Sequence, residues 1–308
     1  MLEIKNVSKS YADKRVLHHI DLRLSHGIYA LLGTNGAGKS TLMNILCNQL
    51  NYEEGSVLYN DKDIRELKQA YYALLGYAPQ QQGLYDEFSG ERFLTYMALL
   101  KNIDRKQIRK EVLRVAELVN MQQHLKQRCG AYSGGMKQRV VIAMALACNP
   151  KLLLADEPTT ALDVTIQAQV LETMKDLRKK FGSAMIMITH DLGIIAEVCD
   201  EVSVVYAGQI VEHGTLEDIF NHTMHPYTEG LFGSLPNIED RKARLQPIPG
   251  LMPDPTNLPK GCPFSPRCKY CTEACKKDRP EKKWASDTHY VRCVRYEEPG
   301  FSIERSEQ

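Results

Sequence analysis

The sequence predicts an α/β fold in which helices cover a mainly parallel β-sheet. One observation is a set of short apolar runs of the kind that forms buried strands, at 28–32, 151–155, 183–189 and 201–208. The other is a stretch with helical character between two of these runs, at 161–180. Strands that alternate with helices favour a parallel sheet, because parallel neighbours need a long crossover connection that is usually helical.

Segments outside this alternation predict three additions to the sheet. Residues 1–11 alternate polar and apolar side chains like a strand, and we expect an N-terminal antiparallel β subdomain. Residues 86–130 have helical periodicity and little glycine, so we expect a helical subdomain inserted at about 86–135. Six prolines fall within 247–263 and predict an extended strap without regular structure.

The bulk composition excludes several classes of protein. A net charge of +1 gives no whole-chain reason to expect a nucleic acid or an acidic membrane as partner. The longest apolar run, Val140–Cys148, is half of the ~18–20 residues that a membrane-spanning helix needs, and the N-terminus has no signal-peptide core. We therefore expect a soluble, cytosolic protein.

A nucleotide site is predicted at 33–40, which fits the pattern G-x-x-x-x-G-K-[ST] between a predicted strand and a predicted helix. Glycines in such a loop let successive backbone N–H groups surround phosphate oxygens at the positive end of the helix dipole. Lys39 can reach the β- and γ-phosphates, and the Ser40 hydroxyl can hold Mg²⁺. The expected ATP-binding residues of the loop are Gly33, Asn35, Gly36, Ala37, Gly38, Lys39, Ser40 and Thr41.

Further candidates lie at or near the ends of other predicted strands. Asp156 fits a Mg²⁺ ligand, and Glu157 is then free to accept a proton from an attacking water. His190 can bond a γ-phosphate, and Gln80 can orient the water or contact Mg²⁺. Taken singly, each of these side chains also fits an ordinary structural position; the glycine loop is what favours the functional interpretation.

A second pair of glycines, Gly134 and Gly135, follows Ser133 at the predicted start of another helix. Inside a helix each glycine costs about 1 kcal/mol relative to alanine. Their backbone N–H groups are therefore expected to face an anion. One ATP needs only one glycine loop, so the chain has two anion-binding devices.

Together these motifs resemble the ATP-binding-cassette (ABC) ATPases from Leu2 to about His225. The resemblance implies a P-loop NTPase (RecA-like) core, a nucleotide-binding domain at 1–225 and a C-terminal extension at 226–308. It also implies that two such domains pack head to tail, so that Ser133, Gly134 and Gly135 of one close over the γ-phosphate bound by the other. Tyr132 and Met136 depart from the usual signature loop. By resemblance, the family's named motifs lie at 33–41 (Walker A), 152–157 (Walker B) and 160–163 (D-loop). Gln80 is then the Q-loop glutamine and His190 the switch histidine. Tyr11 is expected to stack on adenine, and Asp163 is expected at the ATP.

The resemblance divides in the stretch 133–140, a string that two families share. The front of the chain, 1–140, resembles ATPases of drug-, lantibiotic- and antibiotic-type exporters. The part from about 133 onward resembles those of dipeptide, oligopeptide and nickel importers. A hybrid (a natural recombinant, an engineered chimera or a mis-joined sequence) and a divergent member of one family are the alternatives.

Five of the nine cysteines crowd into 262–293. In a cytosolic chain such spacing favours metal binding over disulfides. By resemblance to the extension of peptide-importer ATPases, Cys271 is an addition and four other thiols are ligands. Such a set suits a four-iron four-sulfur cluster, which the resemblance favours, or zinc; thiols without metal are the third alternative. The expected ligands are Cys262, Cys268, Cys275 and Cys293.

The predicted function is ATP hydrolysis with Mg²⁺ that energises an ABC transporter on the inner face of the cell membrane. Import of dipeptides, oligopeptides or nickel ranks ahead of drug or lantibiotic export. Expected partners are transmembrane permease subunits, a second ATPase subunit and, indirectly, an extracytoplasmic substrate-binding protein. A soluble non-transport ABC ATPase is the alternative from another class. It is disfavoured because the stretch from Lys39 to Ser133 is too short for a repair-type coiled coil, and no basic stripe indicates a nucleic-acid partner.

Overall fold

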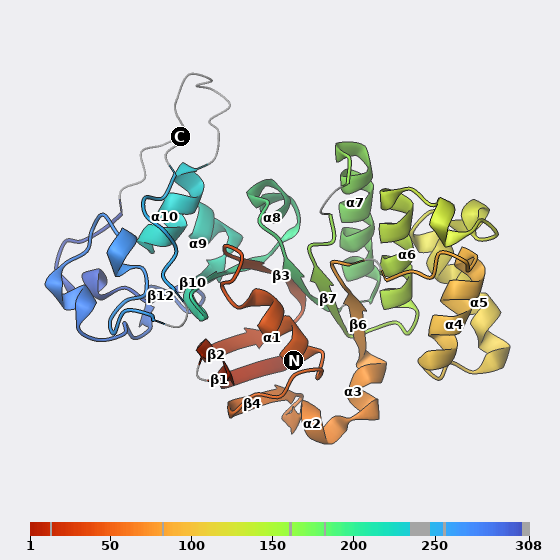
Figure 1. Cartoon of the computed structure of the whole chain (residues 1–308), viewed down its shortest axis with the longest axis horizontal. Helices are drawn as coiled ribbons and strands as arrows, with labels where there is room; N and C mark the ends of the chain where they lie inside the picture. Colours follow the sequence, from red (N-terminus) through yellow and green to blue (C-terminus); the bar gives the residue numbers. More distant parts are fainter. Residues whose placement is uncertain are drawn as a thin grey trace.

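The computed structural model describes residues 1–12, 14–81, 83–159, 162–181, 183–234, 247–254 and 257–303. A central α/β body carries the helical subdomain at one end of the longest axis and the C-terminal extension at the other (Figure 1). The predicted α/β fold, with its N-terminal antiparallel sheet and inserted helices, is confirmed. None of the described helices is both long and apolar enough to cross a membrane.

The larger sheet has a parallel centre and an antiparallel edge. Its described strands are β3 (Gly27–Leu32), β6 (Leu75–Ala78), β7 (Leu152–Asp156), β8 (Ala184–Ile188), β9 (Glu201–Tyr206), β10 (Gln209–Thr215), β11 (Lys283–Trp284) and β12 (Tyr290–Val291). The parallel order is β9–β3–β8–β7–β6, and β10, β12 and β11 continue beyond β9 with antiparallel pairing. Strands β3, β7 and β8 are buried along their whole length, as expected where both faces of a sheet are covered.

One predicted strand is shorter than expected. The run 201–208 forms a strand only to Tyr206, because Ala207 and Gly208 adopt positive φ values of 46° and 77° and turn the chain into β10. The run is apolar beyond the end of the strand because Ala207 in the turn is buried as well, so the apolar pattern alone does not show where the strand ends. The turn matters for function because it lies against the glycine loop: the Gly208 N–H donates to the Ala37 backbone oxygen at 2.9 Å.

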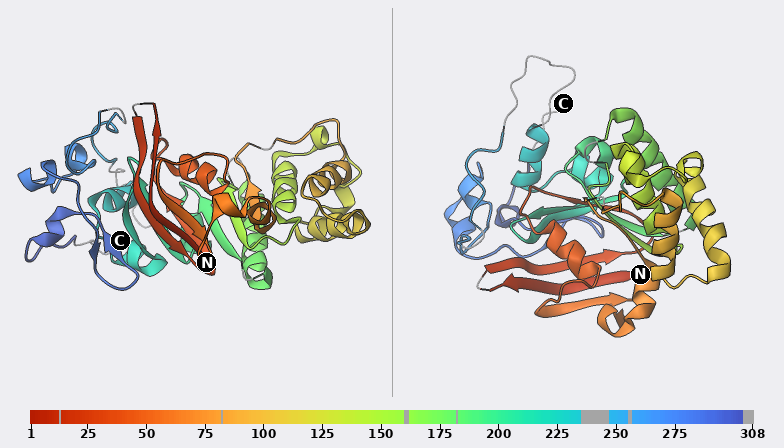
Figure 2. Two further views of the ribbon diagram at one scale, coloured as in Figure 1. Left: turned by 90° about the horizontal axis from the view of Figure 1, so that it is seen from below. Right: turned by 45° about the vertical axis from the view of Figure 1, so that its right-hand side comes forward.

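The smaller sheet is antiparallel, in the order β2–β1–β4–β5. Its strands are β1 (Leu2–Tyr11), β2 (Lys14–Leu24), β4 (Glu54–Tyr59) and β5 (Lys62–Asp63). Buried Leu2 and Ile4 share an apolar core with Leu42 and Met43 of α1 (Lys39–Leu46) and with Leu31 of β3. Helix α1 therefore lies between the two sheets (Figure 2), which fixes the glycine loop that precedes it.

The helical subdomain is built mainly from α4 (Gly90–Leu100) and α5 (Arg105–Leu118), which pack on α6 (Gly134–Leu146). Ser89 and Asp104 cap α4 and α5 by accepting a backbone N–H from the first turn, which explains where each helix begins. The other helical elements are α2 (Ile64–Leu67), α3 (Gln69–Leu74), α7 (Val164–Phe181), α8 (Leu192–Val198), α9 (Leu216–Asn221), α10 (Pro226–Gly233), η1 (Gln122–His124), η2 (Cys129–Ala131), η3 (Ser265–Arg267), η4 (Glu273–Lys276) and η5 (Val294–Glu297).

The C-terminal extension is joined to the main sheet. Strand β12 pairs with β10, with Val291 opposite Glu212 and Tyr290 opposite His213. The described residues of the proline-rich strap contain neither helix nor strand, as predicted. The extension is thus held to the nucleotide-binding body by backbone hydrogen bonds as well as by side chains.

Candidate functional site

The glycine loop 33–40 connects β3 to α1, as the motif predicts. Gly38 is the N-cap of α1 with a φ of 103°, and a Cβ there would lie 2.8 Å from Leu17 Cδ2. A Cβ on Gly33 would lie 2.2 Å from the backbone oxygen of Val205. Neither position can take a larger residue without a shift of its surroundings, so the two glycines hold the loop close against the sheet.

Lys39 points back into the loop. Its Nζ donates to the backbone oxygens of Gly33 at 2.7 Å and Thr34 at 3.0 Å, and the side chain is buried. Burial lowers the pKa of Lys39, while the carboxylates of Glu157 and Asp156 act in the opposite direction. A phosphate group would offer this ammonium charged acceptors in place of neutral ones, which makes stronger hydrogen bonds.

Two carboxylates lie at the end of β7. Burial, followed by the neighbouring Glu157 carboxylate, raises the pKa of Asp156. A divalent cation beside Asp156 would relieve this cost, because it favours the ionised form. Glu157 has a φ of 47°, and its N–H donates to the Ile188 backbone oxygen at 3.0 Å. Such a left-handed conformation costs a non-glycine residue about 1–3 kcal/mol, and strain of this kind is concentrated at functional sites.

Gln80 and His190 both reach Glu157. Nε2 of Gln80 donates to Oε2 of Glu157 at 2.7 Å, and Nδ1 of His190 lies 3.4 Å from Oε1. The three residues follow β6, β7 and β8, which are neighbours in the parallel sheet. The carboxyl ends of these strands therefore bring together three predicted catalytic residues that are far apart in the sequence.

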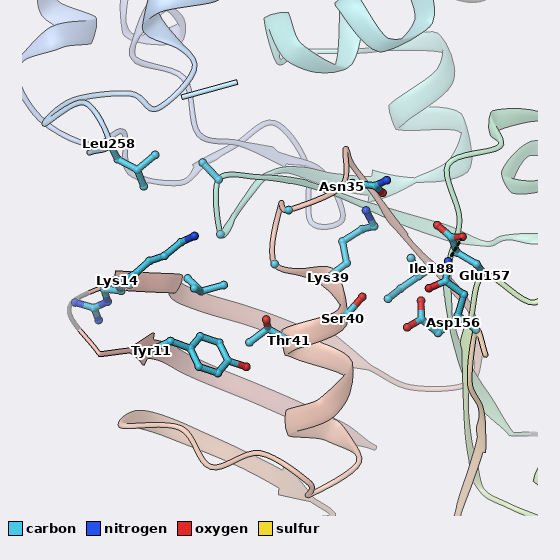
Figure 3. A pocket seen from close by; sticks show the side chains of 17 residues that line it. Tyr11, Lys14, Asn35, Lys39, Ser40, Thr41, Asp156, Glu157, Ile188 and Leu258 are labelled. Carbon is cyan, nitrogen blue, oxygen red and sulfur yellow. Dashed lines mark hydrogen bonds between the residues drawn. The ribbon is translucent and has the colours of Figure 1, made fainter. Parts of the chain in front are cut away.

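A pocket with a volume of about 580 Å³ lies beside these residues (Figure 3). Gln80, Asp156 and Glu157 line it, and His190 does not. Asp156 and Glu157 lie on one side of Ser40, and Tyr11 lies on the other side, beyond Thr41. Tyr11 is 46% exposed, and the Lys9 ammonium lies 5.5 Å from the centre of its ring. All the predicted ATP-binding residues of the loop line the pocket except Gly33 and Ala37.

The motifs did not point to several other residues of the pocket wall. Lys14–Val16 of β2, the turn 207–208 and Leu258 of the strap all line it. Lys14–Val16 can be anticipated, because they begin the strand that follows Tyr11. Leu258 carries no such signal: it lies more than two hundred residues from the loop in sequence, and only the folded strap brings it there.

The predicted signature loop lies outside this pocket. Ser133 caps α6 by accepting a backbone N–H, and Ser133 and Gly134 are exposed while Gly135 is buried. Asp163 is also exposed and lies just before α7. Of the other D-loop residues, Leu162 is partly buried, and 160–161 lie outside the described residues. None of the described signature and D-loop residues lines the pocket formed by the glycine loop of the same chain.

The cysteines of the extension surround a second, small cavity. The four predicted ligands line it, whereas Cys271 does not, and all nine cysteines of the chain are free thiols. In the described part of the chain, however, no group of three or more Cys, His, Asp or Glu side chains is positioned to hold a metal ion. The thiols are gathered around one cavity without forming a finished metal site. These four are Cys262, Cys268, Cys275 and Cys293.

Burial controls the charge of these thiols. It raises the pKa of Cys262 and Cys293 to about 12 and that of Cys268 to about 11. Without a cation, these three thiols are therefore protonated at neutral pH. Neighbouring backbone N–H groups act in the opposite direction: they lower the pKa of these thiols and favour the thiolate. The amides that act in this way are those of Phe264 on Cys262, Tyr270 on Cys268 and Arg295 on Cys293. The Ser265 N–H donates to the Cys262 backbone oxygen at 3.0 Å.

Two family models match the chain. One, described as ABC transporter, matches residues 17–160, and one, described as oligopeptide/dipeptide transporter, C-terminal region, matches residues 211–275. The two matches fall on the nucleotide-binding body and on the extension. The second match includes three of the four thiols that line the small cavity.

Similar curated proteins come from transporters of peptides. The oligopeptide transport ATP-binding protein AppD of Bacillus subtilis is 38% identical over 97% of this chain and 98% of its own length. The oligopeptide transport ATP-binding protein OppD of Haemophilus influenzae is 42% identical over 80% of each chain. Because AppD aligns with nearly the whole chain, the front part that resembles exporter ATPases also aligns with an oligopeptide transport protein. The hybrid origin remains a prediction.

Solved structures agree on the nucleotide-binding body. The dimeric structure of the bacterial ABC transporter cassette MJ0796 has a TM-score of 0.63 and 27% identity, over 70% of this chain and 99% of that chain. A dimeric, post-hydrolysis structure of the same cassette with ADP and Pi has a TM-score of 0.64 and 26% identity. An ATP-binding subunit of an ABC transporter has a TM-score of 0.65 and 27% identity.

Proposed function

The chain belongs to the ATP-binding subunits of ABC transporters, and from this membership we propose that its ATP hydrolysis drives import of dipeptides or oligopeptides across the cell membrane. Its ATPase activity follows from the family. Peptide cargo is supported by the relatives that match almost the whole chain and by the extension that they share with it.

The convergence of Gln80, Glu157 and His190 beside the glycine loop carries the catalytic assignment. Glu157 is the base for the attacking water, His190 contacts the γ-phosphate, and Gln80 orients the water and contacts Mg²⁺. Ser40 and Asp156 are the other Mg²⁺ ligands from the protein. The backbone N–H groups of the loop and Lys39 bind the phosphates, and Tyr11 stacks on adenine.

Dimerisation completes the site. Ser133 and Gly134 are exposed at the start of α6. A Cβ added at Gly134 would meet no other part of the chain within 4 Å, so this side of the helix start is open. The MJ0796 cassette, which shares the fold, is dimeric. We place the signature loop of a second subunit over the γ-phosphate, where its N–H groups stabilise developing negative charge only in the closed dimer. Asp163 lies close to the same interface.

The permease docks between the core and the helical subdomain. A groove with a volume of about 490 Å³ lies between α3 and α4, and its rim carries Tyr72 and Leu100, which are 44% and 58% exposed. Exposed apolar side chains at a groove are suited to a helix of a membrane partner. This contact would hold the ATPase at the inner face of the membrane.

Transport in proteoliposomes tests the proposed function. The chain is co-expressed with candidate permease subunits, and the complex that co-purifies is reconstituted with a substrate-binding protein. ATP-dependent uptake of labelled dipeptides or oligopeptides is the expected result, and Leu100→Asp should reduce recovery of the permease. Uptake of nickel alone would reassign the cargo. Recovery only with an exporter permease would overturn the proposed direction of transport.

We further propose that the thiol cavity holds a metal centre that pins the strap to the core, with a four-iron four-sulfur cluster as the first candidate and zinc as the second. The support is the four-thiol lining of the cavity and the neighbouring backbone N–H groups that lower the pKa of Cys262 and Cys293. When bound, such a centre would convert the thiols to thiolates.

Anaerobic purification followed by iron, sulfide and zinc analysis tests the metal centre. The expected result is bound iron and acid-labile sulfide with visible absorbance, lost in Cys268→Ser and retained in Cys271→Ser. Bound zinc with the same dependence on the two cysteines would assign zinc. Protein that is folded but contains neither metal would contradict the proposal.

A further inference from the structure

Thr34, the second residue of the glycine loop, is held by two residues of the C-terminal extension. Its backbone N–H donates to the Tyr227 hydroxyl at 3.1 Å, and its own hydroxyl donates to Met252 Sδ at 3.4 Å. Tyr227 lies 193 positions further along the chain, so only the fold creates this contact. Neither Tyr227 nor Met252 belongs to the motifs that predict the nucleotide site.

Tyr227 is itself firmly placed. Its side chain is fully buried, and its ring packs on those of Tyr206 and Phe264, with centroid distances of 4.5 Å and 5.5 Å. Its backbone N–H donates to Nδ1 of His225 at 3.0 Å, and the His225 N–H donates to the buried Glu212 carboxylate at 3.0 Å. Burial also raises the pKa of Tyr227, which keeps its hydroxyl neutral. Such a side chain presents its hydroxyl at one position.

The glycine loop is braced from two directions. On the side of Ala37, the turn at Gly208 donates an N–H to the loop. On the side of Thr34, Tyr227 accepts one, while the Thr34 backbone oxygen accepts a bond from Lys39 at 3.0 Å. Thr34 therefore links the phosphate-binding lysine to the extension. A loop held in this way loses less conformational entropy when a ligand binds.

We propose that Tyr227 is a positioning residue for ATP: its hydroxyl holds the glycine loop in the shape that receives the phosphates. The proposal rests on the assignment of ATP binding to this pocket. Tyr227 acts through Thr34 and touches neither the nucleotide nor the water, so its removal should weaken binding without changing the chemistry. The extension then has a direct part in nucleotide affinity.

Tyr227→Phe is the test, because it removes the hydroxyl and keeps the ring. Tyr206→Phe is the matched control, because it removes another buried hydroxyl from the same aromatic cluster. The Tyr206 hydroxyl accepts a hydrogen bond from Arg267 Nη1 at 3.5 Å, whereas the Tyr227 hydroxyl accepts one from the glycine loop. Dissociation constants for ATP, kcat and KM are measured on the full chain, with thermal unfolding to compare stability. Hydrogen exchange of the loop amides without nucleotide provides a second readout.

Tyr227→Phe should weaken ATP binding and raise KM by about two- to tenfold, the range of one net hydrogen bond. Its kcat should stay within about twofold, and the loop amides should exchange faster. Tyr206→Phe should change neither affinity nor exchange of the loop. Equal affinities of wild type and Tyr227→Phe, or equal losses in both variants, would overturn the positioning role. A wild-type chain that binds no ATP would instead overturn the site assignment.

Discussion

The two glycine-bearing helix starts of this chain, at α1 and α6, have the same local chemistry and opposite surroundings. The loop before α1 is enclosed: Gly33 lies against Val205, and Lys39 is buried within the loop. The start of α6 is open: Ser133 and Gly134 are exposed, and apart from neighbouring residues of the same helix no atom lies within 4 Å of a Cβ built on Gly134.

This difference fits the two proposed roles, a phosphate-binding loop at α1 and one half of a dimer interface at α6. Enclosure fixes the backbone N–H groups before the ligand arrives, which lowers the entropy cost of binding. An exposed helix start in water holds an anion weakly and becomes effective only when a partner excludes the solvent. In the proposed dimer, the α1 loop binds phosphate with groups from one chain, and the α6 loop acts on the ATP of a second chain.

The largest expected effect comes from Glu157→Gln, which removes the proposed base and leaves both helix starts intact. ATP hydrolysis should fall at least about 100-fold, while ATP binding persists and the nucleotide-bound dimer accumulates. Phosphate release and light scattering with MgATP measure the two effects. Glu87→Gln, at an exposed carboxylate, is the control and should hydrolyse at the wild-type rate. Near-normal hydrolysis by Glu157→Gln would remove Glu157 from its proposed role.

Gly134→Asp addresses the open side of the comparison. The new side chain has room in the single chain, so folding and ATP affinity should be unchanged. In the dimer its carboxylate would meet the γ-phosphate, and we expect hydrolysis and ATP-induced dimerisation to fall by about 100-fold.

Gly33→Ala is the counterpart on the enclosed side. Its Cβ would lie 2.2 Å from the Val205 backbone oxygen, so this variant should lose stability and ATP binding together. Thermal unfolding and nucleotide titration separate the two behaviours. If Gly134→Asp were as unstable as Gly33→Ala, the α6 start would not be an open surface.

Tyr11→Ala sharpens the description of the enclosed pocket. Removal of an aromatic face from adenine should weaken ATP binding by about fivefold, the lower end of the range for base stacking, because Tyr11 is partly exposed. A titration with a fluorescent ATP analogue measures this. Tyr72→Ala, which removes a similarly exposed tyrosine from outside the pocket, should bind as wild type does. Equal binding by Tyr11→Ala would exclude the stacking role.

The smallest effect concerns a buried histidine that supports the enclosed loop. His18 donates its backbone N–H to Gly208, and burial, with the positive charges of Arg279 and Arg15, lowers its pKa from 6.5 to about 4. The unfolded chain binds this proton near pH 6.5 and the folded chain does not. Stability should therefore be full above this pH and decline as the pH falls to about 4, by at most about 1.4 kcal/mol per pH unit.

His18→Gln tests this dependence by denaturant unfolding at several pH values. The variant should lose stability less steeply than wild type between pH 6.5 and about 4. His124→Gln, at an exposed histidine, should keep the wild-type slope. Identical slopes for wild type and His18→Gln would show that His18 stays uncharged in both states or charged in both.

Much of the fold could be predicted because its signals are local. Strands β3, β7 and β8 are runs of apolar residues, and the motif G-x-x-x-x-G-K-[ST] needs a strand before it and a helix after it. The end of β9 was less predictable: the positive φ of Ala207 depends on how the turn packs against the loop. The pairing of β12 with β10 joins residues with few local strand signals, and it was not predicted.

By itself the sequence determined the family and the strand, glycine loop and helix around 33–40. It also predicted the roles of Lys39, Asp156 and Glu157, because the chemistry of phosphate and metal binding demands those residue types. Only the tertiary structure decided that Gln80 and His190 meet at Glu157, that the extension supports Thr34 through Tyr227, and that the signature loop faces outward. Contacts between distant segments depend on how the sheets and helices pack against one another. This packing is determined by many core residues together, so no local sequence motif predicts it.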